Sequence, residues 1–133
     1  MRTFGVGVLG LHEGRTMLGA LTRTTNARAV AACDINPAKI AEASARYPDI
    51  FCTISYDELL QHPVVDIVAI FTPDPLHGQH IVRAFAAGKY VICTKPVVNT
   101  VANARRILEA SRKSTSKLLV GQSTRFFEPF LRQ

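Results

Sequence analysis

Residues 64–77 have the sequence VVDIVAIFTPDPLH. The segment from Val64 to Phe71 is apolar except for Asp66, and a run of this kind predicts a strand buried on both faces of a sheet. The strand cannot extend through the prolines that follow, so it ends in a stiff turn. Asp74-Pro75 then predicts the start of a helix. The stretch therefore contains a strand, a turn and a helix start in close succession.

The same succession recurs along the whole chain. Further strands are predicted at Phe4–Leu9, Ala29–Cys33, Phe51–Thr53, Tyr90–Cys93 and Lys117–Val120. Helices are predicted from about Arg15 to Thr22, Asn36 to Tyr47, Ser55 to Leu60, Asp74 to Gly88 and Thr100 to Arg112. This alternation predicts an α/β fold, with a doubly wound parallel sheet of Rossmann type in a three-layer αβα arrangement.

The bulk composition fits one globular domain. The chain has 133 residues, of which 47% are hydrophobic and 20% are charged, and this balance excludes a disordered chain. No apolar run approaches the ~20 residues of a membrane span. The N-terminus lacks the apolar stretch and the cleavage site of a signal peptide. We therefore expect no association with a membrane.

The net charge is +6, and the basic residues are spread along the chain except for one cluster. That cluster consists of Arg105, Arg106, Arg112, Lys113 and Lys117. It falls on and after a predicted helix whose apolar positions are Ala104, Ile107 and Leu108. The pattern favours a solvated helix face and no nucleic-acid partner. A positive field also favours an anionic dinucleotide.

The cysteines are odd in number, and Cys33, Cys52 and Cys93 each lie in or beside an apolar run. They are interpreted as buried free thiols, which indicates a reducing compartment and a cytoplasmic protein. His77 and His80 have a spacing that suits metal ligation, but no third ligand is close in the sequence. The sequence therefore predicts no metal site.

A glycine motif occurs at the end of the first predicted strand. A G-x-G-x-x-G match begins at Gly5, but its first glycines lie inside the strand, whereas the dinucleotide fingerprint works at the turn. In the register that begins at Gly10, His12 replaces the second glycine and Arg15 the third, with Gly14 one place early. The helix N-terminus still offers N–H groups to an anion. A glycine turn without a ligand remains the alternative.

Asp34 ends the second predicted strand, 24 residues after Gly10. A carboxylate at this place can accept hydrogen bonds from the ribose hydroxyls of NAD, and it repels the 2′-phosphate of NADP. No arginine follows in residues 35–37. NAD is therefore the expected cofactor, and NADP is less expected. The alternative role of Asp34 is to cap the next helix.

Thr94-Lys95-Pro96 follows the strand at Tyr90–Cys93. Because the carboxyl ends of parallel strands meet at one edge of a sheet, this turn is expected beside the turn at Thr72. A lysine there can hydrogen-bond a substrate oxygen and stabilise the negative charge that develops on it. The alternative is an exposed loop lysine.

The order and spacing of these two turns resemble the nicotinamide-binding domain of the Gfo/Idh/MocA oxidoreductase family. In that family a Thr-Pro-Asn-x-x-His turn and a Glu-Lys-Pro turn recur, although the glutamate is Thr94 here. The resemblance implies that Lys95 is catalytic. It also implies a set of cofactor-binding residues: Gly10, Leu11, His12, Asp34, Thr72, Pro73, His77, Thr94, Lys95 and Pro96.

The resemblance further implies hydride transfer between NAD(P) and a hydroxyl-bearing carbon of a sugar or polyol. Residues 1–121 would form the NAD(P)-binding domain, and residues 122–133, with Phe126 and Phe127, would begin the connection to a C-terminal substrate domain that is absent from this chain. That second domain would carry the oligomer interface, so the chain alone is expected to be inactive. A non-catalytic dinucleotide-binding redox sensor or regulatory module is the alternative, favoured by His12 and Thr94.

Overall fold

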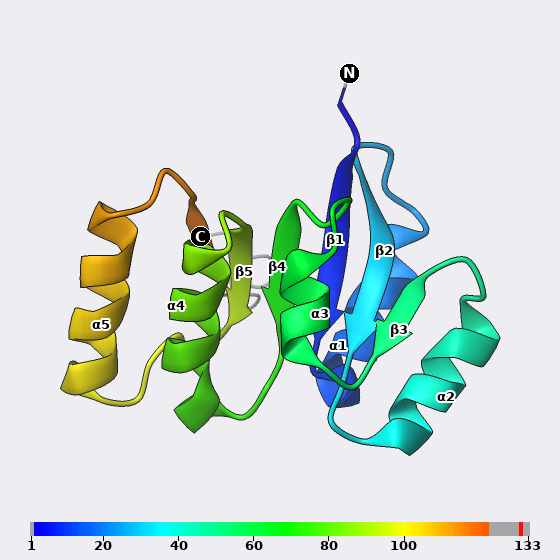
Figure 1. Ribbon diagram of the computed structural model, residues 1–133, viewed down its shortest axis with the longest axis horizontal. Helices are drawn as coiled ribbons and strands as arrows, with labels where there is room; N and C mark the ends of the chain where they lie inside the picture. Colours follow the sequence, from blue (N-terminus) through cyan, green and yellow to red (C-terminus); the bar gives the residue numbers. More distant parts are fainter. Residues whose placement is uncertain (1, 123–130, 132–133) are drawn as a thin grey trace.

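The computed structural model describes residues 2–122 and 131. Six parallel strands form one sheet in the order β3-β2-β1-β4-β5-β6 (Figure 1). The strands are β1 (Phe4–Leu9), β2 (Ala27–Cys33), β3 (Phe51–Thr53), β4 (Ile67–Ile70), β5 (Tyr90–Thr94) and β6 (Leu118–Gly121). The order reverses beside β1, which pairs with β2 on one side and with β4 on the other. In open parallel sheets, the crevice at such a reversal is the usual place for a ligand.

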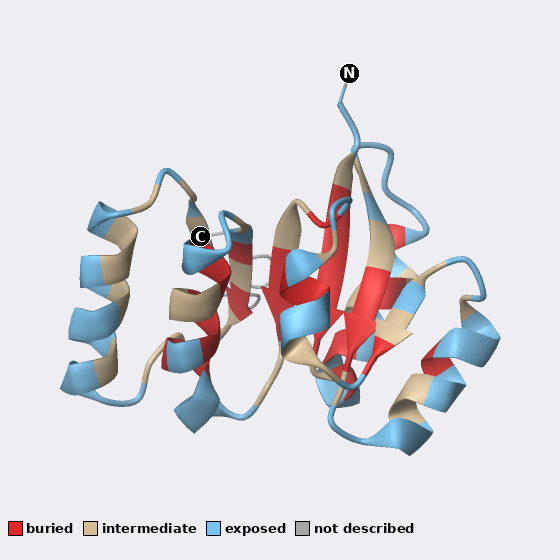
Figure 2. Ribbon diagram, in the orientation of Figure 1, coloured by how far each residue is buried: buried red, intermediate tan, exposed pale blue. Residues whose placement is uncertain are grey.

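Helices cover both faces of the sheet. They are α1 (Leu11–Leu21), α2 (Pro37–Arg46), α3 (Tyr56–Gln61), α4 (His77–Ala86) and α5 (Val101–Arg112), with a short 3₁₀ turn η1 (Asp74–Leu76) before α4. One core forms where α1 and α2 meet the sheet around Val8 and Leu18. A second core forms under α3, α4 and α5 around Ile70 and Ile81 (Figure 2). The predicted three-layer Rossmann arrangement is confirmed.

Consecutive strand residues serve opposite cores, as the twofold period of a strand requires. Val8 belongs to the core under α1, and its neighbour Leu9 belongs to the core under α4. Likewise, Val68 belongs to the core under α4, and its neighbour Ala69 belongs to the core under α1. This double burial explains why the predicted strands read as continuous apolar runs.

Several element boundaries differ from the sequence prediction, among them the starts of α1 and β4. Helix α1 begins at Leu11, four residues before the predicted start, because its first turn depends on a contact distant in sequence. Strand β4 is limited to Ile67–Ile70, shorter than predicted. Before it, the Val65 N–H donates to the carbonyl of His62, and the Asp66 carboxylate accepts from the Gly5 N–H at 2.8 Å.

Three helix details also differ. Asp74 makes no side-chain cap bond, since the chain enters α4 through η1. Ser55 and Glu58 have the spacing of a capping box, but only half of it forms: the Ser55 hydroxyl accepts from the Glu58 N–H, whereas the Glu58 carboxylate accepts from the Thr53 hydroxyl. On α5, Ile107 packs on the core as predicted. Leu108 and Ala104 are exposed there, because Asn103 and Ala110 share the inner face with Ile107.

The predicted solvated face of α5 is present. The five basic residues of the cluster at 105–117 are all exposed. Among residues 2–122 and 131, no helix is long and apolar enough to cross a bilayer. The predicted connection at 122–133, with Phe126 and Phe127, lies almost wholly outside the described residues.

Candidate functional site

The turns singled out in the sequence meet at the carboxyl edge of the sheet. Gly10 follows β1, Asp34 follows β2, Thr72 follows β4 and Lys95 follows β5. These four strands are neighbours in the sheet, so the turns form a continuous row across the point where the strand order reverses. The row is the ligand-binding edge of an open α/β sheet.

Gly10 links β1 to α1 in a conformation that favours glycine. Its φ is 88°, and a Cβ atom there would lie 2.8 Å from the carbonyl carbon of Phe71. Its N–H donates to the carbonyl of Cys33 at 2.9 Å. The backbone of β1, β2 and β4 therefore converges tightly here, and any side chain would be strained.

Asp34 holds the start of α1. Its Oδ2 accepts a hydrogen bond from the Leu11 N–H at 2.7 Å, and its Oδ1 accepts one from the Asn36 N–H at 2.8 Å. Each carboxylate oxygen has a second lone pair for a further donor. The N–H groups of His12 and Glu13 fall in the first turn of α1, where no intrahelical acceptor exists. The arrangement offers a carboxylate and free N–H groups side by side.

Gly14 supplies the close packing between helix and strand. A Cβ atom at Gly14 would lie 2.7 Å from Cγ1 of Val8 and 3.2 Å from Cδ2 of Phe71. In the dinucleotide fingerprint the third glycine has this packing function. Gly14 is one place early in the spacing of the fingerprint, yet it lies on the face of α1 that packs against Val8 and Phe71. Gly5 also packs closely inside β1, where a Cβ atom would overlap the carbonyl oxygen of Val64.

Two exposed isoleucines flank Asp34 and were missed in the sequence. Ile35 is 91% exposed directly after Asp34, and Ile54 is 58% exposed after the adjacent strand β3. Large apolar side chains this exposed at a ligand-binding edge suit a flat apolar group such as a purine ring. In the sequence, a large apolar residue such as Ile35 inside a predicted turn is the feature that could have indicated this surface.

His77 is fully buried at the start of α4. Its Nδ1 lies 2.7 Å from the carbonyl oxygen of Pro96, and its Nε2 lies 2.7 Å from the carbonyl oxygen of Thr72. Both ring nitrogens are thus engaged by the main chain. A contact between this imidazole and a cofactor stays a prediction, and both of its polar atoms already have partners within the domain.

His80 lies one turn further along α4 and has different chemistry. Its Nδ1 is 2.9 Å from the Thr72 hydroxyl. Burial, with Arg83 and His77 nearby, lowers the pKa of His80 to about 4. The two histidines bind separate atoms of the Thr72 turn, so their rings are not paired for a metal.

Lys95 is exposed in the turn after β5, next to the half-buried Thr94. The Lys95–Pro96 peptide bond is cis. The Pro96 carbonyl is held by His77, while the Lys95 side chain is accessible from solvent. The structure thus brings the lysine turn and the Thr72 turn together through one buried ring.

Comparison with known proteins agrees with this geometry. Residues 4–122 match the family model for the oxidoreductase family with an NAD-binding Rossmann fold. The chain belongs to the Gfo/Idh/MocA family. Its relatives include a 1-carboxy-3-chloro-3,4-dihydroxycyclohexa-1,5-diene dehydrogenase of Comamonas testosteroni, 30% identical over 96% of this chain and 32% of that protein. An inositol 2-dehydrogenase of Acidothermus cellulolyticus is 29% identical over 94% of this chain and 36% of its own length.

Solved structures of this family superpose closely on the domain. Apo scyllo-inositol dehydrogenase from Lactobacillus casei has a TM-score of 0.91 and 25% sequence identity, and the match covers 98% of this chain and 40% of the dehydrogenase chain. A putative myo-inositol dehydrogenase from Sinorhizobium meliloti has a TM-score of 0.89 and 29% identity, covering 98% of this chain and 39% of its own. The chain spans about a third of the curated relatives that it matches.

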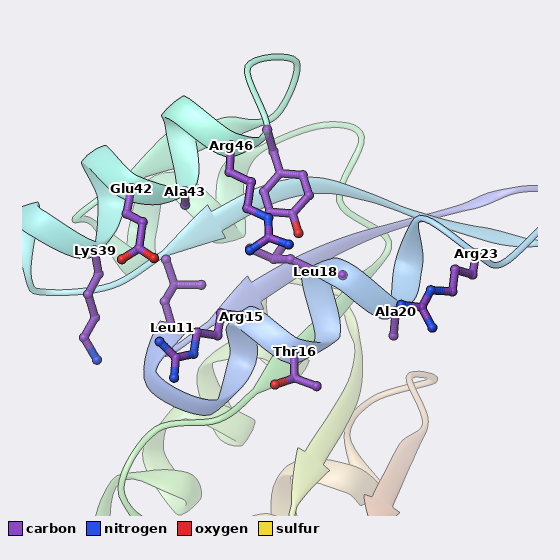
Figure 3. Close-up of a pocket in the computed structure, with 12 residues that line it drawn as sticks. Leu11, Arg15, Thr16, Leu18, Ala20, Arg23, Lys39, Glu42, Ala43 and Arg46 are labelled. Carbon is purple, nitrogen blue, oxygen red and sulfur yellow. The ribbon is translucent and has the colours of Figure 1, made fainter.

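The Gfo/Idh/MocA domain also has a groove of about 410 Å³ between α1 and α2. Its walls carry four cationic side chains and one carboxylate: Arg15, Arg23, Lys39, Arg46 and Glu42. Figure 3 shows Arg15 and Lys39 at the end beside Leu11, and Arg23 at the other end. Arg15 and Lys39 therefore place positive charge near the first turn of α1, which also holds the carboxylate of Asp34.

Proposed function

We propose that this domain binds a nicotinamide dinucleotide along the carboxyl edge of its sheet and, with a substrate domain, transfers hydride to or from a sugar or polyol. The observation that carries the proposal is Asp34, whose carboxylate lies beside the free N–H groups of the first turn of α1. A dinucleotide needs both features, since its ribose hydroxyls donate hydrogen bonds to a carboxylate and its pyrophosphate accepts hydrogen bonds from backbone N–H groups.

The pyrophosphate would lie against the turn from Gly10 to His12. Gly10 permits the tight turn that aims the first turn of α1 at the phosphate, and the backbone N–H groups there donate to it. Arg15 and the other cations of the α1–α2 groove attract the anion. His12 is exposed where the fingerprint has a glycine, so the pyrophosphate has less space there than in an intact fingerprint.

The adenosine half would lie over Asp34, with Ile35 and Ile54 against the adenine. The nicotinamide half would lie at the turns formed by Thr72-Pro73 and Thr94-Lys95-Pro96. Lys95 would then hydrogen-bond the substrate oxygen and stabilise its developing charge, while the nicotinamide carries the hydride. Thr94 cannot act as the carboxylate that the family motif has at this position.

The relatives support one class of substrate. An inositol dehydrogenase and a xylose dehydrogenase are among them, which supports a small polyhydroxylated substrate. Contacts to that substrate and between subunits would come from a second domain. The free thiols of Cys33, Cys52 and Cys93 support a cytoplasmic protein.

Titration of the chain with NADH and NADPH, followed by nucleotide fluorescence, tests the proposal. We expect saturable binding with a lower Kd for NADH, because the Asp34 carboxylate repels a 2′-phosphate. Asp34→Ala should weaken NADH binding and narrow the difference between the two cofactors. Absence of binding to either nucleotide would contradict the proposal, and tighter NADPH binding would contradict the role of Asp34.

A non-catalytic dinucleotide sensor is a second candidate, because His12 and Thr94 depart from the family motifs. The two candidates differ at Lys95. In a chain that includes a substrate domain, Lys95→Ala should lower kcat by roughly 10²–10⁴-fold and leave NADH affinity nearly unchanged. A sensor would show no turnover in the wild type.

A further inference from the structure

The ring of His77 joins two turns that are distant in sequence. Thr72 follows β4 and Pro96 follows β5, and each contributes a carbonyl oxygen 2.7 Å from one nitrogen of the same imidazole. The side chain is completely shielded from solvent. The contact therefore has fixed partners on both sides, and bulk water is excluded from it.

The identity of these partners constrains the ring. A carbonyl oxygen accepts hydrogen bonds and cannot donate one. A neutral imidazole has one N–H group and one bare nitrogen, so it can satisfy only one of the two carbonyls. The bare nitrogen would then direct its lone pair at the lone pairs of the other oxygen at 2.7 Å. Only the imidazolium form donates to both.

The distances agree with a charged ring. Bonds of about 2.7–2.9 Å are typical of charged N–H donors, and two of them offset much of the cost of burying the cation. Titratable and charged groups on the surrounding elements include Asp74 in η1, His80 and Arg83 on α4, Asp57 on α3, which pairs with Arg83, and Lys95 beyond β5.

We propose that His77 is a buried imidazolium that fastens the lysine turn to the Thr72 turn, and so acts as a positioning residue for the nicotinamide end of the site. The bond from Nδ1 fixes the carbonyl of Pro96, and with it the direction in which Lys95 leaves the backbone. The bond from Nε2 fixes the carbonyl of Thr72 in the other turn. The positioning role rests on the proposed function, whereas the charge state of the ring does not. His77 thus acts from behind the site and needs no contact with the cofactor.

Nitrogen-15 NMR of the histidine rings tests the charge state directly in the chain of residues 1–133. At pH 7 both ring nitrogens of His77 should resonate as protonated nitrogens, and His80 should show one protonated and one bare nitrogen. Assignment uses the loss of each signal in His77→Gln and His80→Gln. A bare nitrogen at His77 would overturn the proposal, whether or not the chain binds NADH.

The same two variants test the positioning role. The His77→Gln amide nitrogen can replace one of the two bonds at most, so the backbone amide resonances of Lys95 and Val97 should shift and NADH affinity should fall about tenfold. His80→Gln is the matched control: it alters the contact to the Thr72 hydroxyl but keeps the bridge. Equal effects of the two variants on Lys95 would refute the positioning role. Failure of the wild type to bind NADH would instead refute the proposed function.

Discussion

The Oδ2 atom of Asp34 accepts a hydrogen bond from the backbone N–H of Leu11 at 2.7 Å, although 23 residues separate the two in sequence. The bond joins the end of β2 to the first residue of α1. The other carboxylate oxygen of Asp34, Oδ1, accepts a hydrogen bond from the backbone N–H of Asn36, the residue before α2. One carboxylate therefore sets the geometry of two adjacent βα turns, and the proposed cofactor site depends on both.

Replacing Asp34 by asparagine tests this structural role. The amide can accept at one position only, so one backbone N–H loses its partner. The free energy of unfolding should fall by about 1–3 kcal/mol, which urea denaturation at neutral pH measures. Glu42→Gln on the α2 surface is a control for loss of a carboxylate. Unchanged stability of Asp34→Asn would mean that the two N–H groups find other acceptors.

The two glycines of α1 should respond oppositely to alanine. Gly14→Ala places a methyl group 2.7 Å from Val8 and should destabilise the domain by about 1–3 kcal/mol. Gly19→Ala has its nearest neighbour, the Tyr47 hydroxyl, at 3.8 Å, so the gain in helix propensity should stabilise by up to about 1 kcal/mol. Thermal unfolding of both variants measures the contrast. Similar shifts in Tm would contradict the close packing of Gly14 on β1.

Acid should destabilise the domain through His80. Its pKa is lowered to about 4 by burial, while the unfolded chain takes up the proton near 6.5. Above pH 6.5 the neutral His80 ring therefore makes its full contribution to the free energy of unfolding. That contribution, about 2–3 kcal/mol, is lost as the pH falls toward 4. His80→Gln should make the midpoint of urea denaturation less dependent on pH in this range. His12→Gln, a control at an exposed histidine, should leave that dependence unchanged. A profile that the His80 variant leaves unchanged would contradict the neutral buried ring.

The three thiols should differ in reactivity. Burial, with Asp34 nearby, raises the pKa of Cys33 to about 12, and burial, with Asp74 nearby, raises that of Cys93 to about 12. Cys52 is only half-buried, although burial raises its pKa as well. A disulfide reagent at pH 8 should modify Cys52 first and the other two only as the chain unfolds. Rapid labelling of all three in the folded protein would contradict the described burial.

The sequence was sufficient for the sheet because β1, β2, β4 and β5 are buried on both faces and read as apolar runs. It placed Gly10, Asp34 and Lys95 at strand ends correctly, since strand ends and turns are local features. The start of α1 was not predicted correctly, because the carboxylate that accepts from its first N–H belongs to Asp34, 23 residues further along the chain. Periodicity alone does not identify such partners.

The same limit applies to single side chains. In the sequence, His77 looks like an exposed polar residue at the start of a helix. Its ring is buried against Pro96, and the two residues come together only because β4 pairs with β5. Gly14 was misjudged because its role depends on Val8 and Phe71, not on its spacing from Gly10. These features arise from contacts between elements, which one sequence does not specify.

The central place of β1 has a consequence for the nascent chain. Its second partner, β4, begins at Ile67, so one edge of β1 has no strand to pair with until residues 10–70 have been synthesised. At ribosomal rates of about 5–20 residues per second, this delay is roughly 3–12 s. During that time an apolar edge containing Val6 and Val8 is open to strands of other molecules. Aggregation during synthesis is therefore the hazard that this strand order imposes.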